Sequence, residues 1–156
     1  MRRRPVPDDG TDGQLGHTPV ARSGLMNSYV ELLPRSLAPM AGAPVRSLAG
    51  GLNHTLCVDG DGALWAWGKG DCGKLGTGKG EKSSEAPARV AALEGVPLAA
   101  VACGDFHSAA LDEQGRVYTW GWGGSYFGGY GMLGHGGTDE HKTPKLVESL
   151  VAEGLR

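Results

Sequence analysis

Two stretches of the chain decide its fold: GLNHTLCVDGDGALWAWG at residues 51–68 and GDFHSAALDEQGRVYTWG at residues 104–121. They belong to a longer match, because a shift of 53 residues places Pro34–Gly68 on Pro87–Gly121 without a gap. Eleven of these 35 pairs are identical, whereas about three would be expected by chance even in this Gly-rich composition. A period of this size is typical of stacked supersecondary units.

The second copy shows how one repeat is expected to fold. Residues 98–103 and 107–111 are short apolar runs separated by a turn. Residues 112–115, Asp-Glu-Gln-Gly, predict a hairpin-type turn, and residues 117–121 carry the β-branched and aromatic side chains of a strand. A further strand is expected over residues 88–93, so each repeat supplies about four short strands and no long helix.

The strand around the tryptophans has two apolar sides. Trp65 and Trp67 point to one side and Leu64 and Ala66 to the other. Such a strand must be covered on both faces, which happens when sheets are stacked between neighbours.

A loop signature occurs three times, as Gly13-Gln-Leu-Gly16, Gly73-Lys-Leu-Gly76 and Gly131-Met-Leu-Gly134. Two glycines around one leucine favour a tight turn that fixes the loop to the core. The third copy comes five residues later than the repeat requires, and the extra residues lie within 122–130.

These motifs together resemble the repeat of the regulator of chromosome condensation family. The expected structural positions are Gly51, His54, Trp67, Gly68, Gly73, Leu75 and Gly76 in the first copy, and Gly104, His107, Trp120, Gly121, Gly131, Leu133 and Gly134 in the second. The resemblance covers roughly residues 10 to 147. It implies a β-propeller, usually with seven blades.

We therefore expect an all-β fold, a partial β-propeller of about two to three four-stranded antiparallel blades that is a fragment of a seven-bladed ring. Five segments are expected: a disordered N-terminal segment (1–9), the tail of an incomplete blade with its connector (10–33), a first full repeat (34–86), a second full repeat with a loop insertion at 122–130 (87–143), and the truncated start of a third repeat (144–156).

Motifs that suggest chemistry are better explained by the repeat. His54 and His107 occupy equivalent positions, so we expect them to hydrogen-bond backbone within each blade and not to form a catalytic pair. Gly68–Gly73 fits a dinucleotide-binding pattern, but glycines follow it where a helix is required. Gly73–Lys79 approaches a P-loop but lacks the final Ser or Thr. No catalytic residue and no cofactor are expected.

Two further groups of residues are candidates for a site. His135, Asp139, Glu140 and His141 could hold a metal, but their polar Gly/Thr-rich loop favours a solvated segment, so no metal is expected. Four aromatic residues fall in the insertion and form either a partner-binding loop or a packing surface for a neighbouring blade, and we favour packing. They are Trp122, Tyr126, Phe127 and Tyr130.

Composition narrows the compartment and the partners. A net charge of −2 with mixed acids and bases does not indicate a dominant basic surface for nucleic acid, so direct nucleic-acid binding by this segment is not expected. No apolar run is long enough to span a membrane. The three cysteines lack metal or redox spacing, and the Met-Arg-Arg-Arg start lacks the apolar stretch of a signal peptide. We expect an intracellular chain, cytoplasmic or nuclear, without excluding organelle import.

The predicted function is a non-catalytic protein–protein interaction module, and the chain is not expected to be an enzyme. The resemblance implies a protein partner, either a small GTPase or a chromatin protein. It also implies two alternatives: part of a guanine-nucleotide exchange factor for a Ran-like GTPase, or the regulatory propeller segment of a larger multidomain protein such as a ubiquitin ligase.

Overall fold

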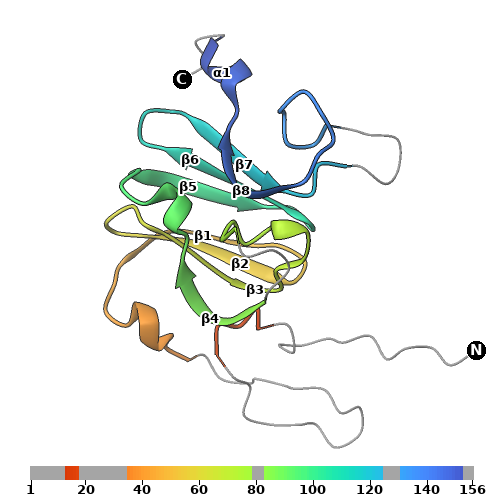
Figure 1. Cartoon of the computed structure of the whole chain (residues 1–156). Coiled ribbons are helices and arrows are strands. Elements are labelled where there is room, and N and C mark those ends of the chain that lie inside the picture. The colour runs from red at the N-terminus through yellow and green to blue at the C-terminus, as the bar shows by residue number, and fades with distance from the viewer. Residues whose placement is uncertain (1–12, 18–34, 79–82, 125–130, 153–156) are drawn as a thin grey trace, which may run out of the picture.

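The computed structural model describes residues 13–17, 35–78, 83–124 and 131–152, which contain two four-stranded antiparallel sheets stacked one on the other (Figure 1). The first sheet is ordered β1 (Val45–Gly50), β2 (His54–Asp59), β3 (Leu64–Gly68) and β4 (Ser84–Arg89). The second is ordered β5 (Leu98–Cys103), β6 (His107–Asp112), β7 (Val117–Gly121) and β8 (His141–Leu146). The predicted all-β fold of four-stranded antiparallel units is confirmed.

Helical elements in the described residues are short. They are the 3-10 turns Ala38–Met40, Asp71–Gly73 and Ala91–Leu93 and the five-residue helix α1 (Glu148–Ala152). Among the described residues, no helix has the length and apolar character that a membrane span requires.

The strands of the two sheets pair in the same register, as the sequence repeat predicts. In the first sheet Cys57 of β2 lies opposite Trp65 of β3, and in the second Ala110 of β6 lies opposite Tyr118 of β7, each 53 residues later. The hairpin between β6 and β7 closes as expected, with the Gly115 amide donating to the Asp112 carbonyl at 3.1 Å. The same residues therefore occupy the same places in both sheets.

The predicted bounds of the strand over residues 88–93 are wrong. Strand β4 begins at Ser84 and ends at Arg89, and residues 91–93 form a 3-10 turn. Pro87 lies inside β4, which is the edge of its sheet, where a residue without an N–H is tolerated. A strand predicted to begin after the proline therefore starts too late, because an edge strand can contain a proline.

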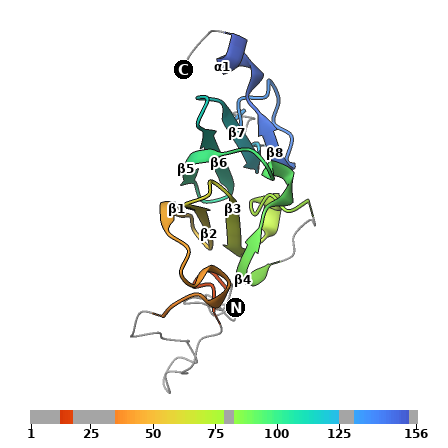
Figure 2. The same ribbon diagram turned by 90° about the vertical axis from the view of Figure 1, so that its left-hand side faces the viewer.

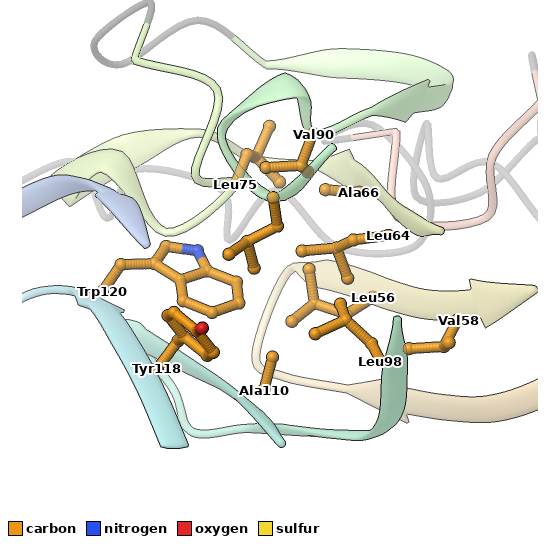
Figure 3. Close-up of a cluster of buried hydrophobic side chains, with 11 residues drawn as sticks. Leu56, Val58, Leu64, Ala66, Leu75, Val90, Leu98, Ala110, Tyr118 and Trp120 are labelled. Carbon is orange, nitrogen blue, oxygen red and sulfur yellow. The ribbon is translucent and has the colours of Figure 1, made fainter. Parts of the chain in front are cut away.

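The main core fills the space between the two sheets (Figure 3). Leu56, Leu64 and Ala66 of the first sheet pack with Tyr118 and Trp120 of the second, and all five are buried. On the other side of the first sheet, Trp67 packs in a smaller cluster whose other members are Leu37, Met40, Cys57 and Trp65. The prediction that β3 is covered on both faces is confirmed, and Figure 2 shows the stacking from the side.

Candidate functional site at the junction of the sheets

The three Gly-x-Leu-Gly segments fold as the same turn. In each, the amide of the last glycine donates to the carbonyl of the first, at 2.9 Å in Gly13–Gly16, 2.9 Å in Gly73–Gly76 and 3.0 Å in Gly131–Gly134. All six glycines have positive φ, which explains why this residue stands at both ends. We call them the first, second and third turns.

The second turn joins the two sheets. It leaves the first sheet after β3, and the carbonyl of Lys74 at its centre accepts hydrogen bonds from Trp120 Nε1 at 2.8 Å and Ser108 Oγ at 2.7 Å. A Cβ on Gly76 would lie 2.8 Å from the same indole nitrogen, so only glycine fits there. We call Ser108, Trp120 and Gly121 the second indole site.

The first turn binds the first sheet in the same way. The carbonyl of Gln14 accepts hydrogen bonds from Trp67 Nε1 at 2.8 Å and Thr55 Oγ1 at 3.0 Å. A Cβ on Gly16 would lie 3.0 Å from Trp67 Nε1. Thr55, Trp67 and Gly68 form the first indole site, so the tryptophan, the hydroxyl residue and the turn of the repeat act together.

His54 also crosses the junction. Its Nε2 lies 2.9 Å from Ser108 Oγ of the second sheet, so the expected bond to backbone within its own blade is wrong for His54. Because Ser108 gives its proton to the Lys74 carbonyl, it must accept the proton of His54 Nε2–H. In a nucleophile–base pair the serine donates to the histidine, so this pair has the opposite polarity and leaves Ser108 unactivated.

The surroundings of His54 keep its ring neutral. Burial, reinforced by the positive charge of Lys74, lowers the pKa of His54 to about 4. Lys74 is itself fully buried, forms an ion pair with Asp71 and lies over the ring of Phe106, 5.2 Å from its centroid.

This environment predicts that acid weakens the fold. The pKa of a histidine is about 6.5 in the unfolded chain, so that state takes up the proton first. We expect the free energy of unfolding to fall by about 3 kcal/mol between pH 6.5 and 4. Urea denaturation at a series of pH values measures this slope.

The variant His54→Gln is expected to flatten the slope between pH 6.5 and 4, whatever its effect on stability at neutral pH. The lowered pKa values of Asp59 and Asp112 add most of their own loss below about pH 4, and burial also lowers the pKa of His135, so a smaller slope should remain in the variant. An equally steep slope in His54→Gln would contradict the assignment.

The position three residues before each repeat histidine is glycine because the imidazole ring of that histidine packs directly against it. A Cβ on Gly51 would come 2.3 Å from His54 Cε1, and one on Gly104 would come 2.4 Å from His107 Cε1. The Gly51 Cβ would also lie 2.5 Å from the Gly104 carbonyl oxygen, so the β1–β2 and β5–β6 turns touch.

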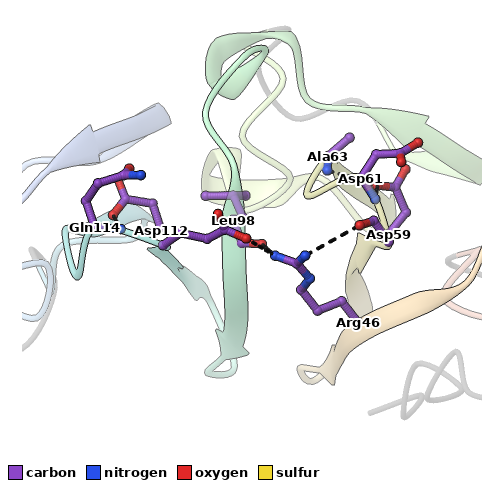
Figure 4. Close-up of polar contacts among 9 residues, drawn as sticks. Arg46, Asp59, Asp61, Ala63, Leu98, Asp112 and Gln114 are labelled. Atoms are coloured by element: carbon purple, nitrogen blue, oxygen red, sulfur yellow. Dashed lines mark hydrogen bonds and ion pairs between the residues drawn. The ribbon is translucent and has the colours of Figure 1, made fainter.

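The sequence analysis placed Asp112 in a hairpin-type turn but assigned no role to its side chain or to Asp59, although the two occupy identical repeat positions. Each is buried and holds its hairpin turn: Asp59 lies beside Asp61 and Ala63 (Figure 4) and accepts from their amides at 3.1 and 2.9 Å. Asp59 also accepts from Trp65 Nε1 at 2.8 Å. The sequence signal for this role was that both aspartates recur at the same distance before the following strand.

Asp112, the aspartate of the second repeat, shows how hydrogen bonds stabilise a buried carboxylate in this core. Burial by itself raises the pKa of Asp112, but hydrogen bonds from Arg116 and from the Gln114 amide outweigh burial, so its pKa lies below the ordinary value. On the same rim Arg46 donates to the Leu98 carbonyl at 3.0 Å and pairs with Glu113, which ties the two sheets together (Figure 4).

The candidate partner loop is described only at its start. Trp122 packs edge-on against Phe106, with ring centroids 6.1 Å apart, and its amide donates to the Phe106 carbonyl at 2.9 Å. Tyr126, Phe127 and Tyr130 lie outside the described residues. Phe106, which sequence reasoning did not select, is brought to Trp122 by the β5–β6 turn.

The candidate metal cluster comes together only in part. His135 and His141 lie edge to face with ring centroids 4.8 Å apart, and His135 Nε2 is 3.0 Å from Thr119 Oγ1. Over the described ranges, no three His, Cys, Asp or Glu side chains are grouped to hold a metal ion.

Four-stranded sheets stacked face to face, each receiving a turn from the preceding unit, define consecutive blades of a β-propeller. The family profile described as "Regulator of chromosome condensation (RCC1) repeat" matches residues 61–111 and 114–153, and a second profile of that description matches residues 45–74 and 99–128. The chain belongs to the RCC1 repeat family.

Known proteins agree with this assignment. The chain is 36% identical over 143 residues to mouse E3 ubiquitin-protein ligase HERC2, a match that covers 90% of this chain and 3% of HERC2. The crystal structure of human WBSCR16 superposes with a TM-score of 0.65 at 26% identity, over 93% of this chain and 33% of that one. That of Prp20p from Saccharomyces cerevisiae gives 0.62 at 22% identity, over 88% and 32%. The chain therefore spans only a small part of HERC2 and about a third of each solved structure.

Proposed function

We propose that this chain is a non-catalytic protein-recognition module built from RCC1-type propeller blades, and that it works inside the cell. The proposal rests on how the chain uses the side chains that could act as a nucleophile and a base. His54 and Ser108, which could have formed a nucleophile–base pair, are both engaged in holding two blades together. Rigid blades with exposed turns suit recognition by shape.

One rim offers a surface for a partner. The β1–β2 and β5–β6 turns touch there; the first carries Leu52, which is exposed, and the second carries Phe106, which packs against the half-buried Trp122. We call Leu52, Phe106 and Trp122 the aromatic rim. Aromatic side chains, tryptophan above all, often carry much of the binding energy of protein interfaces.

Two kinds of partner are supported by relatives. Prp20p, which shares the fold, was described together with its binding to Gsp1p and histones. We therefore propose a small GTPase of the Ran type or a chromatin protein as the partner of the aromatic rim.

Binding assays with the immobilised chain test this proposal, with a Ran-type GTPase and a histone octamer as the two probes. We expect one probe to bind, and the double variant Phe106→Ala/Trp122→Ala to bind it at least about tenfold more weakly. Val45→Ala, which shortens an exposed apolar side chain at the opposite end of β1, is the control and should bind normally. Absence of binding to both probes, or full binding by the double variant, would contradict the proposal.

Two alternatives have specific support. The fold of Prp20p favours a part of an exchange factor, and in that case the chain should accelerate release of a fluorescent nucleotide from a Ran-type GTPase. The 36% identity to HERC2 favours the propeller segment of a ubiquitin ligase. Sequencing the full transcript would show whether a ligase domain is joined to these repeats.

A further inference from the structure

A pocket of about 420 Å³ lies at the end of the first sheet opposite the aromatic rim. One wall is the turn between β2 and β3, at residues 61–64, and the other is formed by residues 89–97, except Ala92, where the chain leaves β4 and runs to β5. Both walls stand between strands of the two sheets, so the pocket belongs to the passage from one blade to the next. Its volume is in the range of about 300–1,000 Å³ that is usual for ligand pockets. We call it the connector pocket.

The connector pocket combines an apolar lining with two carboxylates. Val90 and Leu93 of the lining are buried and Val96 is half-buried. Asp61 on one wall and Glu94 on the other are exposed. Among the described residues, neither carboxylate forms an ion pair or a hydrogen bond. A positively charged ligand would therefore meet two carboxylates that have no partner in this part of the chain.

Arg89 also lines the pocket, but its charge is already used. Its guanidinium lies over the ring of Trp65, 5.0 Å from the centroid, and 3.7 Å from a carboxylate oxygen of the buried Asp59. That ion pair offsets the charge of Asp59 and leaves Asp61 and Glu94 uncompensated. The pocket as a whole therefore attracts cations, and a cation with an aliphatic stem also covers the apolar lining.

The second repeat shows how a guanidinium lies beside the same hairpin turn. Arg116 is the equivalent of Ala63, 53 residues later. Its Nε donates to Asp112 Oδ2 at 2.6 Å, and its Nη2 donates to Gln114 Oε1 at 3.4 Å. In the first repeat Ala63 leaves the place beside the turn open, and Asp61 offers a charged oxygen where Gln114 offers a neutral one (Figure 4).

The two acids are absent from the equivalent positions of the second repeat. Asp61 corresponds to Gln114, and Glu94 corresponds to Val151, because the segments after β4 and β8 make the same turn. The charge of the connector pocket is therefore a property of this pair of blades and not of the repeat in general.

We propose that the connector pocket binds the side chain of an arginine that a protein partner presents. The guanidinium would lie beside the β2–β3 turn, as Arg116 does in the second repeat, and would donate to Asp61 and Glu94. Its aliphatic stem would cover Val96 and Pro97. The contact rests on the recognition role proposed above, but it uses the end of the strands opposite the aromatic rim.

Titration of the nitrogen-15-labelled chain with the blocked tripeptide acetyl-Gly-Arg-Gly-amide tests the site, at about 50 mM salt so that exposed charges are weakly screened. We expect saturable, millimolar binding with the largest NMR shifts at the amides of Asp61, Ala63 and Val96. The citrulline counterpart has nearly the same shape but no charge, so it should bind about tenfold more weakly. Absence of saturable shifts at these amides, or equal binding of the citrulline peptide, would overturn the proposal.

Filling the pocket from within is a second test. Ala63→Arg introduces the side chain that the second repeat carries as Arg116, so the arginine peptide should no longer show saturable binding over the same titration range. Circular dichroism checks that the variant is folded. A folded Ala63→Arg that binds the peptide as the unaltered chain does would mean that the peptide lies elsewhere.

A double variant keeps the shape of the pocket and removes its charge. Asp61→Asn/Glu94→Gln should bind the arginine peptide about tenfold more weakly, because two exposed ion pairs are lost. Asp105→Asn/Glu85→Gln is the matched control, since it removes one aspartate and one glutamate charge from exposed residues outside the pocket. The control should bind like the unaltered chain. Equal weakening in both would show that net charge alone attracts the peptide, and the assignment of the pocket would fail.

The aromatic rim is tested separately, because an arginine can also stack on aromatic rings. Phe106→Ala/Trp122→Ala should bind the arginine peptide normally, although it should lose the partner of the aromatic rim. If this variant loses the peptide, the peptide binds at the rim and the connector pocket is not its site. If the peptide binds as predicted while neither protein probe binds, the pocket is supported and the partner proposed for the rim is wrong.

Discussion

Replacing Trp120 with alanine is expected to lower the free energy of unfolding by about 3–5 kcal/mol. The indole is completely buried between the sheets, and its Nε1 holds the Lys74 carbonyl of the second turn. The substitution removes both the packing and the hydrogen bond that join the blades. Since a domain has about 5–15 kcal/mol of stability, the variant should be largely unfolded under mild denaturing conditions. Urea denaturation followed by circular dichroism measures the loss.

Two companion variants show what the indole contributes. Trp120→Phe keeps most of the buried apolar surface but loses the N–H, so a loss of about 1–3 kcal/mol is expected. Trp122→Ala removes a half-buried ring on the rim and should cost clearly less than Trp120→Ala. Equal losses in Trp120→Ala and Trp122→Ala would refute the assignment of Trp120 to the junction.

Gly51→Ala is expected to destabilise the chain by about 1–3 kcal/mol through a single added methyl group. The new Cβ would lie 2.3 Å from His54 Cε1 and 2.5 Å from the Gly104 carbonyl oxygen. The ring can move only by losing its bond to Ser108, and the carbonyl belongs to backbone of the other sheet. The strain therefore falls on the contact between the two blades.

The adjacent Gly50→Ala is the control for this prediction. Nothing lies within 4 Å of the Cβ that it would add, and Gly50 has no positive φ. Its effect on the free energy of unfolding should stay within about 0.5 kcal/mol. A similar loss from both alanines would mean that the His54 ring does not rest on Gly51.

Much of the fold could be predicted because its signals are local. Strands β5, β6 and β7 follow from short apolar runs between turn residues, and they agree with the structure to within one residue. The two-sided burial of β3 follows from the period of two along a strand. Strand β4 was misplaced because a proline inside an edge strand gives the same local signal as a proline before a strand.

The contacts of the junction could not be predicted in the same way, because they join residues far apart in sequence. Trp67 binds Gln14 across 53 residues and His54 binds Ser108 across 54. The repeat identified the tryptophan, the histidine and the Gly-x-Leu-Gly turn as structural positions, but not which groups meet. Asp59 and Asp112 were overlooked for a similar reason, since a buried acid reveals itself only by the amides that surround it.

Both indole sites hold a turn by the same hydrogen bond, from a tryptophan Nε1 to the carbonyl at the second position of the turn. Hydrogen exchange of the indole protons, followed by nitrogen-15 NMR on the assigned chain, tests it most directly. We predict that the Nε1 protons of Trp67 and Trp120 both exchange far more slowly than that of free tryptophan, as hydrogen-bonded protons do. Exchange of either proton at the rate of free tryptophan would contradict the account.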